Sequence, residues 1–225
     1  MKAGLIIAVD GPSGVGKSSS SRTLAERLGY QYIDTGALYR VIGLLAWEQQ
    51  TSPSDTEQLA ALCENLLLRF VSSATGVRIF LGERDITAEI RQPEVSQMAS
   101  KVSAQPVVRQ GLLALQRNMG KRGGVVMEGR DIGTVVFPDA DIKFFLDASA
   151  EERGRRRYAE LQQQGVTTTI ETTVREMAER DQRDSNREHA PLRCANDAIA
   201  IDTTGLSLDE VIDTMLRHVE NTRKC

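Results

Sequence analysis

The strongest constraint on the fold is a glycine-rich turn that directly follows a short apolar run near the N-terminus. Residues Leu5–Val9 are apolar, Asp10 follows, and Gly11–Ser18 then reads GPSGVGKS. This segment matches GxxxxGK[ST] at every required position, between a predicted strand and a predicted helix. Its glycines let backbone N–H groups turn toward a phosphate group, and the helix N-terminus adds partial positive charge. The sequence therefore predicts a phosphate-binding loop within an α/β fold.

Two side chains of this loop carry the expected chemistry of a nucleoside triphosphate site. Lys17 is expected to place its charge on the outer phosphates, and Ser18 is expected to offer its hydroxyl to Mg²⁺. The loop alone is shared by GTPase switches, motor ATPases and small-molecule kinases. A GTPase would need a base-reading NKxD element, which the sequence lacks. A remodelling ATPase would usually end a strand in paired acidic residues, whereas residues 128–131 read EGRD, and the arginine suits a second anion.

Short apolar runs recur along the chain, and each ends at a polar, turn-forming residue. Near-continuous hydrophobicity predicts strands covered on both faces, as in a parallel sheet, whose carboxyl edge binds ligands. Between them, helices are predicted at 17–28, 106–119 and 207–219, the last with a capping box formed by Ser207 and Glu210. The predicted strands are Leu5–Val9, Tyr30–Ile33, Val125–Met127, Ile142–Leu146 and Ala198–Ile201.

We predict a single domain, residues 1–225. Two regions within it depart from the alternation of strands and helices. The first, 63–103, is expected to be an inserted subdomain. A helix around 59–67 precedes a hairpin of 68–71 and 77–81. The second, 151–188, is rich in arginine and poor in apolar residues, and we expect it to be exposed and mobile.

Composition narrows the partners and the compartment. Lys+Arg 28 against Asp+Glu 31 gives a net charge of −3, which excludes a generally basic nucleic-acid binder. No stretch approaches the ~18 apolar residues of a membrane span. Cys63, Cys194 and Cys225 lack metal-site spacing and are expected to be reduced thiols, so we expect a cytoplasmic protein. Nothing in the sequence demands an oligomer, and we expect a monomer.

Arginines mark a candidate site for a second phosphate group. Arg40 follows the second predicted strand and Arg130 follows the third. Arg180, Asp184 and Arg187 share one helical face by their spacing. Arginine is favoured over lysine where a phosphate is bound through two hydrogen bonds. Taken alone, however, the last three residues are more typical of a solvent-exposed helix held by weak i,i+4 ion pairs.

Taken together, these blocks resemble bacterial cytidylate kinases, a family of nucleoside monophosphate kinases, almost from end to end. The motifs that carry the resemblance are GPSGVGKSS, IDTGALYR, EGRDIGTVVFPDA, IKFFLDAS followed by EER, and ERDQRDSNREHAPL. The resemblance implies a P-loop kinase core and transfer of the γ-phosphoryl group of ATP to CMP or dCMP. It also implies that 63–103 is a monophosphate-binding subdomain and that 151–188 contains a lid.

The resemblance further assigns roles residue by residue. ATP would be bound by Gly11, Pro12, Ser13, Gly14, Val15, Gly16, Lys17, Ser18 and Ser19. The acceptor's phosphate would be surrounded by Thr35, Arg40, Arg130 and Arg187. The cytosine would be read by Ser100, Arg109 and Asp131. The ribose and the lid would be held by Arg180 and Asp184. The catalytic set would be Lys17, Arg130, Arg180 and Arg187. Thr35 stands where serine is common, and Glu128 stands where aspartate is also seen.

Rival functions on the same fold remain at this point. A kinase for AMP, UMP or shikimate would share the loop, and a hydroxyl acceptor would need a base, for which Asp34 is the well-placed candidate. A nucleotide-dependent switch would bind ATP without an acceptor. An acceptor phosphate is already ionised and needs no base, so His189 and His218, which lie outside the motifs, are expected to be structural or surface residues.

Overall fold

Two compact units make up the chain. In the computed structural model, which describes residues 4–64, 66–73, 76–163 and 165–224, the first unit consists of 1–34 and 117–225 and the second of 35–116. The second unit contains the predicted insert 63–103 and is larger than it. Among the described residues, no helix is long and apolar enough to cross a membrane. Cys63 and Cys194 are free thiols, and Cys225 lies outside the described residues.

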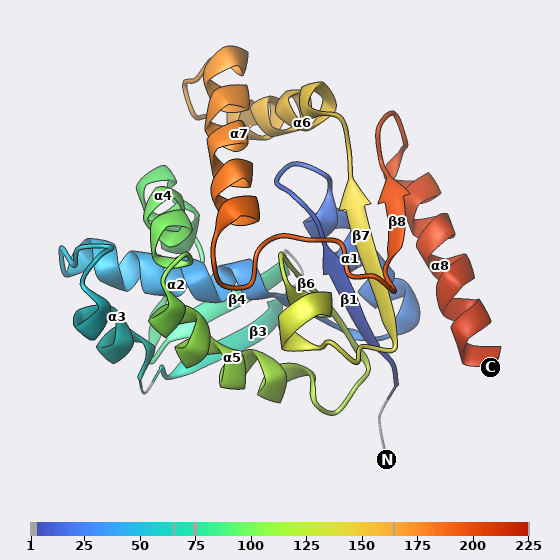
Figure 1. Ribbon diagram of the computed structural model, residues 1–225, viewed down its shortest axis with the longest axis horizontal. Helices are drawn as coiled ribbons and strands as arrows, with labels where there is room; N and C mark the ends of the chain where they lie inside the picture. The colour runs from blue at the N-terminus through green and yellow to red at the C-terminus, as the bar shows by residue number, and fades with distance from the viewer. Residues whose placement is uncertain (1–3, 65, 74–75, 164, 225) are drawn as a thin grey trace. The chain divides into compact units, whose positions relative to one another are not determined.

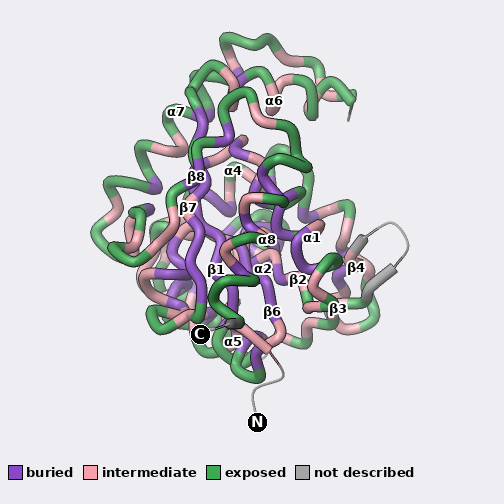
Figure 2. Tube along the Cα trace, turned by 90° about the vertical axis from the view of Figure 1, so that its right-hand side faces the viewer, coloured by how far each residue is buried: buried purple, intermediate pink, exposed green. Residues whose placement is uncertain are grey.

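A five-stranded parallel sheet forms the centre of the first unit, as the sequence predicts. Its order is β2-β6-β1-β7-β8. β1 is buried at every position, and Figure 2 shows β1, β6 and β7 as buried segments. Each predicted strand is present, with its carboxyl end extended by one or two residues: β1 (Ile6–Asp10), β2 (Gln31–Asp34), β6 (Val125–Gly129), β7 (Ile142–Asp147) and β8 (Ile199–Asp202).

Helices α1 (Lys17–Leu28) and α8 (Leu208–Lys224) pack on each other and against this sheet. The core between them includes Val9, Leu24, Phe144 and Met215, all almost fully buried. The predicted capping box begins α8: the backbone N–H of Ser207 donates to Glu210 Oε2 at 2.8 Å, and Ser207 Oγ accepts from the N–H of Glu210 at 3.3 Å. His218 on α8 lies edge-on to the ring of Phe144, as expected of a structural residue.

The arginine-rich region 151–188 of the first unit folds as two helices. These are α6 (Ala150–Gln163), which lies beyond the carboxyl end of β7 (Figure 1), and α7 (Ile170–Asn186), which packs on α6. Thr169 caps α7 by accepting the N–H of Thr172 at 3.2 Å. Although most of the region is exposed, Met177 and Asp184 are buried. A short π-helical segment, η2 (Ile132–Val136), follows β6.

The second unit packs helices against a small antiparallel sheet of order β3-β4-β5. β3 (Leu68–Ser73) and β4 (Gly76–Leu81) form the predicted hairpin, and β5 (Arg84–Asp85) was not predicted. The core of this unit includes Val41, Leu44, Ile79 and Ile90. The helices are α2 (Thr35–Glu48), α3 (Thr56–Cys63), η1 (Glu89–Arg91), α4 (Pro93–Val102) and α5 (Pro106–Gly120), the last of which contains the boundary between the units.

The helix predicted around 59–67 is wrong in position. The observed helix, α3, begins after Asp55, whose carboxylate accepts the N–H of Gln58 at 3.0 Å, and it ends at Cys63. The leucine spacing continues past the true end because Leu66 and Leu68 pack into the hairpin core instead. The capping signal of Asp55 is therefore more informative here than the apolar periodicity.

Candidate functional site

The glycine-rich loop connects β1 to α1 as the sequence predicts. Gly11 has φ +149°, and a Cβ atom there would overlap the carbonyl oxygen of Leu146 on β7, so only glycine fits. Gly16, with φ +89°, precedes the first turn of α1. Lys17 begins that turn, is 7% exposed and donates from Nζ to the carbonyl oxygen of Pro12 at 2.6 Å. Burial and the neighbouring Arg130 lower the pKa of Lys17 to about 7.

Ser13 joins this loop to three side chains from other elements of the first unit. Arg130 Nη2 donates to Ser13 Oγ at 3.0 Å. The N–H of Ser13 donates to Asp181 Oδ1 on α7 at 3.2 Å, and Arg153 Nη1 on α6 donates to the carbonyl oxygen of Ser13 at 3.1 Å. Arg153 also pairs with Asp181. Both helices of the 151–188 region therefore contact the phosphate-binding loop directly.

Asp184 of α7 is the centre of an arginine cluster. Arg130 Nε donates to Asp184 Oδ2 at 3.0 Å, and Arg187 and Arg180 approach the same carboxylate at 3.7 and 4.0 Å. Arg187 also lies 3.8 Å from Asp131. Burial raises the pKa of Asp184, but the three guanidinium groups outweigh it, and the net pKa is lowered. Asp184 and Arg187, which directly follows α7, therefore do not belong to a solvent-exposed face, since their side chains are 8% and 5% exposed. The side chain of Arg180 is 41% exposed.

A pair of carboxylates lies where β2 and β6 end side by side. Asp34 and Glu128 are register partners, and Glu128 is 3% exposed. Burial raises the pKa of Glu128, and Asp34 adds to the increase, while Lys17, Tyr32 and Ser18 oppose it. Tyr32 donates its phenolic hydrogen to Glu128, and Ser18 forms a side-chain hydrogen bond to Glu128 as well. A hydroxyl and a carboxylate at the loop suit Mg²⁺, which takes few protein ligands and keeps several waters.

Asp10, at the end of β1, is a further buried carboxylate. Its Oδ1 accepts the N–H of Ile132 at 2.9 Å and its Oδ2 accepts the N–H of Gly133 at 2.7 Å. Burial raises the pKa of Asp10 to about 6, against the lowering effect of the two N–H groups. Of the nearby charges, Asp131 raises this pKa and Lys17 lowers it.

The second unit holds the remaining predicted residues. Ser100 on α4 and Arg109 on α5 are 8% and 9% exposed. Arg109 Nη1 donates to the carbonyl oxygen of Ser103 at 3.1 Å, and Ser103 Oγ donates to the carbonyl oxygen of Ser100 at 3.0 Å. The guanidinium of Arg109 also stacks 5.3 Å from the ring centre of Tyr39. On α2, Thr35 is buried and Arg40 is half-buried.

Comparison with known proteins decides the family. The cytidylate kinase family model matches residues 7–221. The chain belongs to the cytidylate kinase family. Its relatives include a cytidylate kinase of Geobacter sulfurreducens, 53% identical over 214 residues that cover 95% of this chain and 92% of the relative. Cytidylate kinase 1 of Haemophilus influenzae is 47% identical over 216 residues, covering 96% and 94%.

Among solved structures, an uncharacterized protein from Eubacterium ventriosum superposes with a TM-score of 0.54 at 14% identity. The match covers 96% of this chain and 98% of that one, and at this identity it supports the fold alone. The predicted α/β core is confirmed by the five-stranded parallel sheet, with its phosphate-binding loop between β1 and α1. Membership of the cytidylate kinase family, with its P-loop kinase fold, is shown by the family model and the relatives.

In this cytidylate kinase family member, the first unit brings together the loop residues with Arg130, Asp131, Asp184 and Arg187, while Arg180 reaches the cluster more loosely. Sequence reasoning missed Asp10, Arg153 and Asp181 as part of this constellation, and it did not pair Asp34 with Glu128. The available signal was positional, because Asp10, Asp34 and Glu128 all stand at carboxyl ends of strands.

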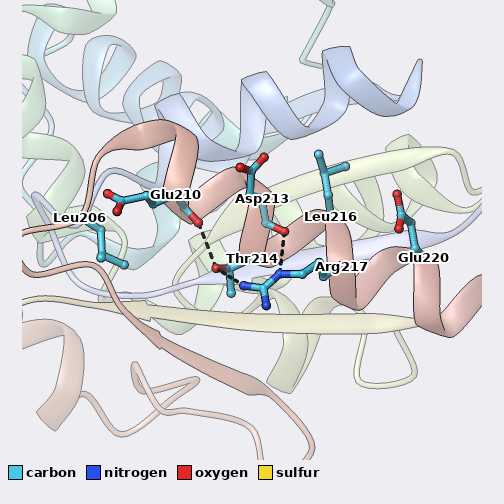
Figure 3. A pocket seen from close by; sticks show the side chains of 7 residues that line it. All are labelled: Leu206, Glu210, Asp213, Thr214, Leu216, Arg217 and Glu220. Atoms are coloured by element: carbon cyan, nitrogen blue, oxygen red, sulfur yellow. Dashed lines mark hydrogen bonds between the residues drawn. The ribbon is translucent and has the colours of Figure 1, made fainter.

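A separate groove runs along α8 and has a volume of about 710 Å³ (Figure 3). It is lined by exposed polar residues such as Glu210, Asp213 and Arg217, and Arg217 Nη2 donates to Thr214 Oγ1 at 3.0 Å. Among the residues that the structure describes, the lining comes from α8 and the adjoining Leu206, and it includes none of the predicted site residues. The groove therefore has no part in the candidate active site.

Proposed function

We propose that this chain transfers the γ-phosphoryl group of ATP to CMP and dCMP, giving ADP and CDP or dCDP. Its membership of the cytidylate kinase family supports the acceptor. The observation that carries the proposal is the position of Arg130, which hydrogen-bonds Ser13 of the loop and Asp184 of the arginine cluster at 3.0 Å each. One guanidinium thus contacts both the loop proposed to bind the donor and the arginine cluster proposed to bind the acceptor phosphate, which supports direct transfer between two phosphates.

The donor would be bound through the loop amides and Lys17, whose ammonium is favoured by phosphate charge. Ser18 would hold Mg²⁺, with Glu128 orienting the serine hydroxyl by accepting its hydrogen. When bound there, Mg²⁺ would supply positive charge to neutralise the transferring phosphoryl group. Arg153, which contacts Ser13 from α6, would add positive charge on the lid side.

The acceptor would be bound by two sets of side chains. Arg130 and Arg187, with Thr35 and Arg40 from the second unit, are proposed to bind its phosphate, which attacks as an already ionised oxygen. Asp131, Ser100 and Arg109 are proposed to read the cytosine by hydrogen-bond complementarity. Arg180 and Asp184 are proposed to hold the ribose and the closing lid. Catalysis then consists of positioning, charge neutralisation and exclusion of water rather than base catalysis.

We further propose a cytoplasmic monomer, and the free thiols of Cys63 and Cys194 support a reducing compartment. Membership of a kinase family supports small-molecule substrates over nucleic acid. Size-exclusion chromatography with light scattering would test the oligomeric state directly.

The decisive test is an ADP-release assay with CMP, dCMP, UMP, AMP, GMP and shikimate as acceptors. Turnover with CMP, with or without dCMP, is expected, and strongest activity with AMP or shikimate would refute the proposal. ATP hydrolysis without acceptor dependence would favour a nucleotide switch. Lys17→Ala and Arg130→Ala should each lower turnover by about a hundredfold or more with the fold retained. Near-normal CMP phosphorylation by Arg130→Ala would contradict the acceptor assignment.

A further inference from the structure

The segment that follows Arg130 and Asp131 is intrinsically a poor helix. η2 (Ile132–Val136) reads IGTVV, and a five-residue stretch of glycine and β-branched residues does not hold helical shape by itself. Side chains from other elements of the first unit hold it instead. Arg117 donates to the carbonyl oxygens of Val135 and Val136 at 3.0 Å each. Lys143 of β7 donates to the carbonyl oxygen of Pro138 just beyond.

Asp10 holds the opposite end of this segment, the end that adjoins Asp131. Its two carboxylate oxygens accept the N–H groups of Ile132 and Gly133, one each, at 2.9 and 2.7 Å. Two bonds from one rigid carboxylate to consecutive peptides fix both the position and the rotation of the backbone that leaves Asp131. The space is close-fitting, since a Cβ atom on Gly133 would lie 3.4 Å from Asp10 Oδ2 and 3.1 Å from Lys143 Cδ.

Stability alone does not account for a carboxylate at this strand end. Asp10 is 4% exposed, and the other four residues of β1 are apolar. Removing its charge from water is costly, and the nearby charge of Asp131 adds to the cost. Lys17 offsets part of it. The two hydrogen bonds to η2 are what the carboxylate contributes in return, and their effect is on the geometry of the segment that carries Arg130 and Asp131.

We propose that Asp10 is a positioning residue for the acceptor nucleotide: by holding the N–H groups of Ile132 and Gly133, it fixes the backbone that presents Arg130 and Asp131. This inference rests on the proposed CMP kinase activity. It predicts a larger effect on the acceptor than on ATP, because the two hydrogen bonds of Asp10 are made to the segment after Asp131. Asp10 acts on Lys17 of the loop only through its charge, which influences the pKa of that lysine less than burial, Arg130, Glu128 or Arg180 does.

Asp10→Asn is the sharpest perturbation, since it preserves shape while one of the two backbone N–H groups then faces an NH₂ group. Loss of one charge-assisted bond should raise KM for CMP by about tenfold or more and leave KM for ATP within about twofold. Asp141→Asn is the matched control. Asp141 Oδ2 accepts the N–H of Ile6 at 2.7 Å at the other end of the same strand, so both Michaelis constants should stay unchanged.

Circular dichroism and hydrogen exchange at Ile132 and Gly133 complete the test. Faster exchange at these two amides in Asp10→Asn, with a selective rise in KM for CMP, would support the proposal. An unchanged KM for CMP, or equal rises in both constants, would overturn it. If Asp10→Asn fails to fold, Asp10→Ser, whose hydroxyl reaches at most one amide, carries the same prediction. CMP turnover by the unsubstituted protein tests the proposed function. The ratio of KM for CMP in the variant to KM for CMP in the parent tests the role of Asp10.

Discussion

Replacing Asp184 by asparagine would remove the negative charge at the centre of the arginine cluster while preserving its shape. Arg130 would lose its carboxylate partner at 3.0 Å, and Arg187 would lose one at 3.7 Å. The side chains of these arginines are 17% and 5% exposed, so water compensates little for the loss. Arg180, at 4.0 Å and 41% exposed, contributes little to the cost.

The expected loss of stability depends on the interaction partners that each arginine retains. Breaking a buried ion pair by removing one partner typically costs ~3–5 kcal/mol. Arg130 retains Ser13, and Arg187 retains Asp131 at 3.8 Å, which places Asp184→Asn near the lower end. A loss of about 3 kcal/mol should lower the melting temperature of a chain of this size by roughly 6–12 °C.

Thermal unfolding followed by circular dichroism would measure this shift, with Glu160→Gln as the control. Glu160 pairs with Arg157 on the surface of α6, where the two side chains are 53% and 35% exposed, so its loss should cost no more than about 0.5 kcal/mol. Inorganic phosphate should stabilise Asp184→Asn more than the parent, because it supplies the missing negative charge. A melting temperature within about 2 °C of the parent would refute the electrostatic reasoning.

Three further predictions address the phosphate-binding loop and its surroundings. Gly11→Ala should lower the free energy of unfolding by about 2 kcal/mol or more. Gly29→Ala is the control: Gly29 has φ +66° and no atom lies within 4 Å of the new Cβ, so the substitution should cost only about 1 kcal/mol. Equal losses of stability in denaturant titrations would contradict the overlap of a Cβ at Gly11 with Leu146. ATP binding at about pH 8 should take up protons, because phosphate charge raises the lowered pKa of Lys17. Calorimetry in buffers of different ionisation enthalpy measures this uptake, and the same uptake in Lys17→Met would exclude that lysine as its source. The pKa of Asp10 is raised to about 6, so the stability that its protonated form contributes is present below about pH 4 and is lost as the pH rises through 6. The free energy of unfolding of Asp10→Asn should therefore rise by ~3 kcal/mol relative to that of the parent between about pH 4 and pH values above 6. A difference in stability between the two proteins that does not change with pH would show that Asp10 does not titrate in this way.

The sheet and the glycine-rich loop were predictable because each rests on a local signal. Strands covered on both faces leave near-continuous apolar runs, and Gly11 occupies a conformation and a space that admit only glycine. α1 begins at Lys17 as predicted, because Gly16 and the loop fix its first turn. The elements that were missed carry weaker signals. β5 has two residues, and η2 consists of glycine and β-branched residues that do not indicate a helix.

The candidate site was predictable to the extent that its residues belong to recognisable motifs. Spacing alone favoured a solvent-exposed face for Arg180, Asp184 and Arg187. This interpretation was wrong for Asp184 and Arg187, because it treats α7 in isolation. The helix buries Asp184 by packing against other elements of the first unit, where Arg130, which directly follows β6 and lies 54 residues away in the sequence, donates to its carboxylate. Sequence periodicity describes the faces of one helix and contains no information about what covers them.

Asp10 shows a different limit, since its role depends on both partners of a long-range contact. Its acceptor groups meet N–H groups 122 and 123 residues further along the chain, and backbone N–H groups have no residue-type signature. Asp34 and Glu128 face each other through the pairing of β2 with β6, which is equally invisible before the strand order is known. The carboxyl edge of the sheet thus collects Arg130, which its motif reveals, and the buried carboxylates of Asp10 and Glu128. The partners of these carboxylates, which are backbone N–H groups and the side chains of Tyr32, Ser18 and Lys17, are revealed only by the fold. Burial of Asp10 and Glu128 raises the cost of folding, while Asp10 holds two backbone N–H groups and Glu128 holds the hydroxyls of Tyr32 and Ser18 beside the phosphate-binding loop. We therefore infer that their burial serves substrate positioning rather than stability.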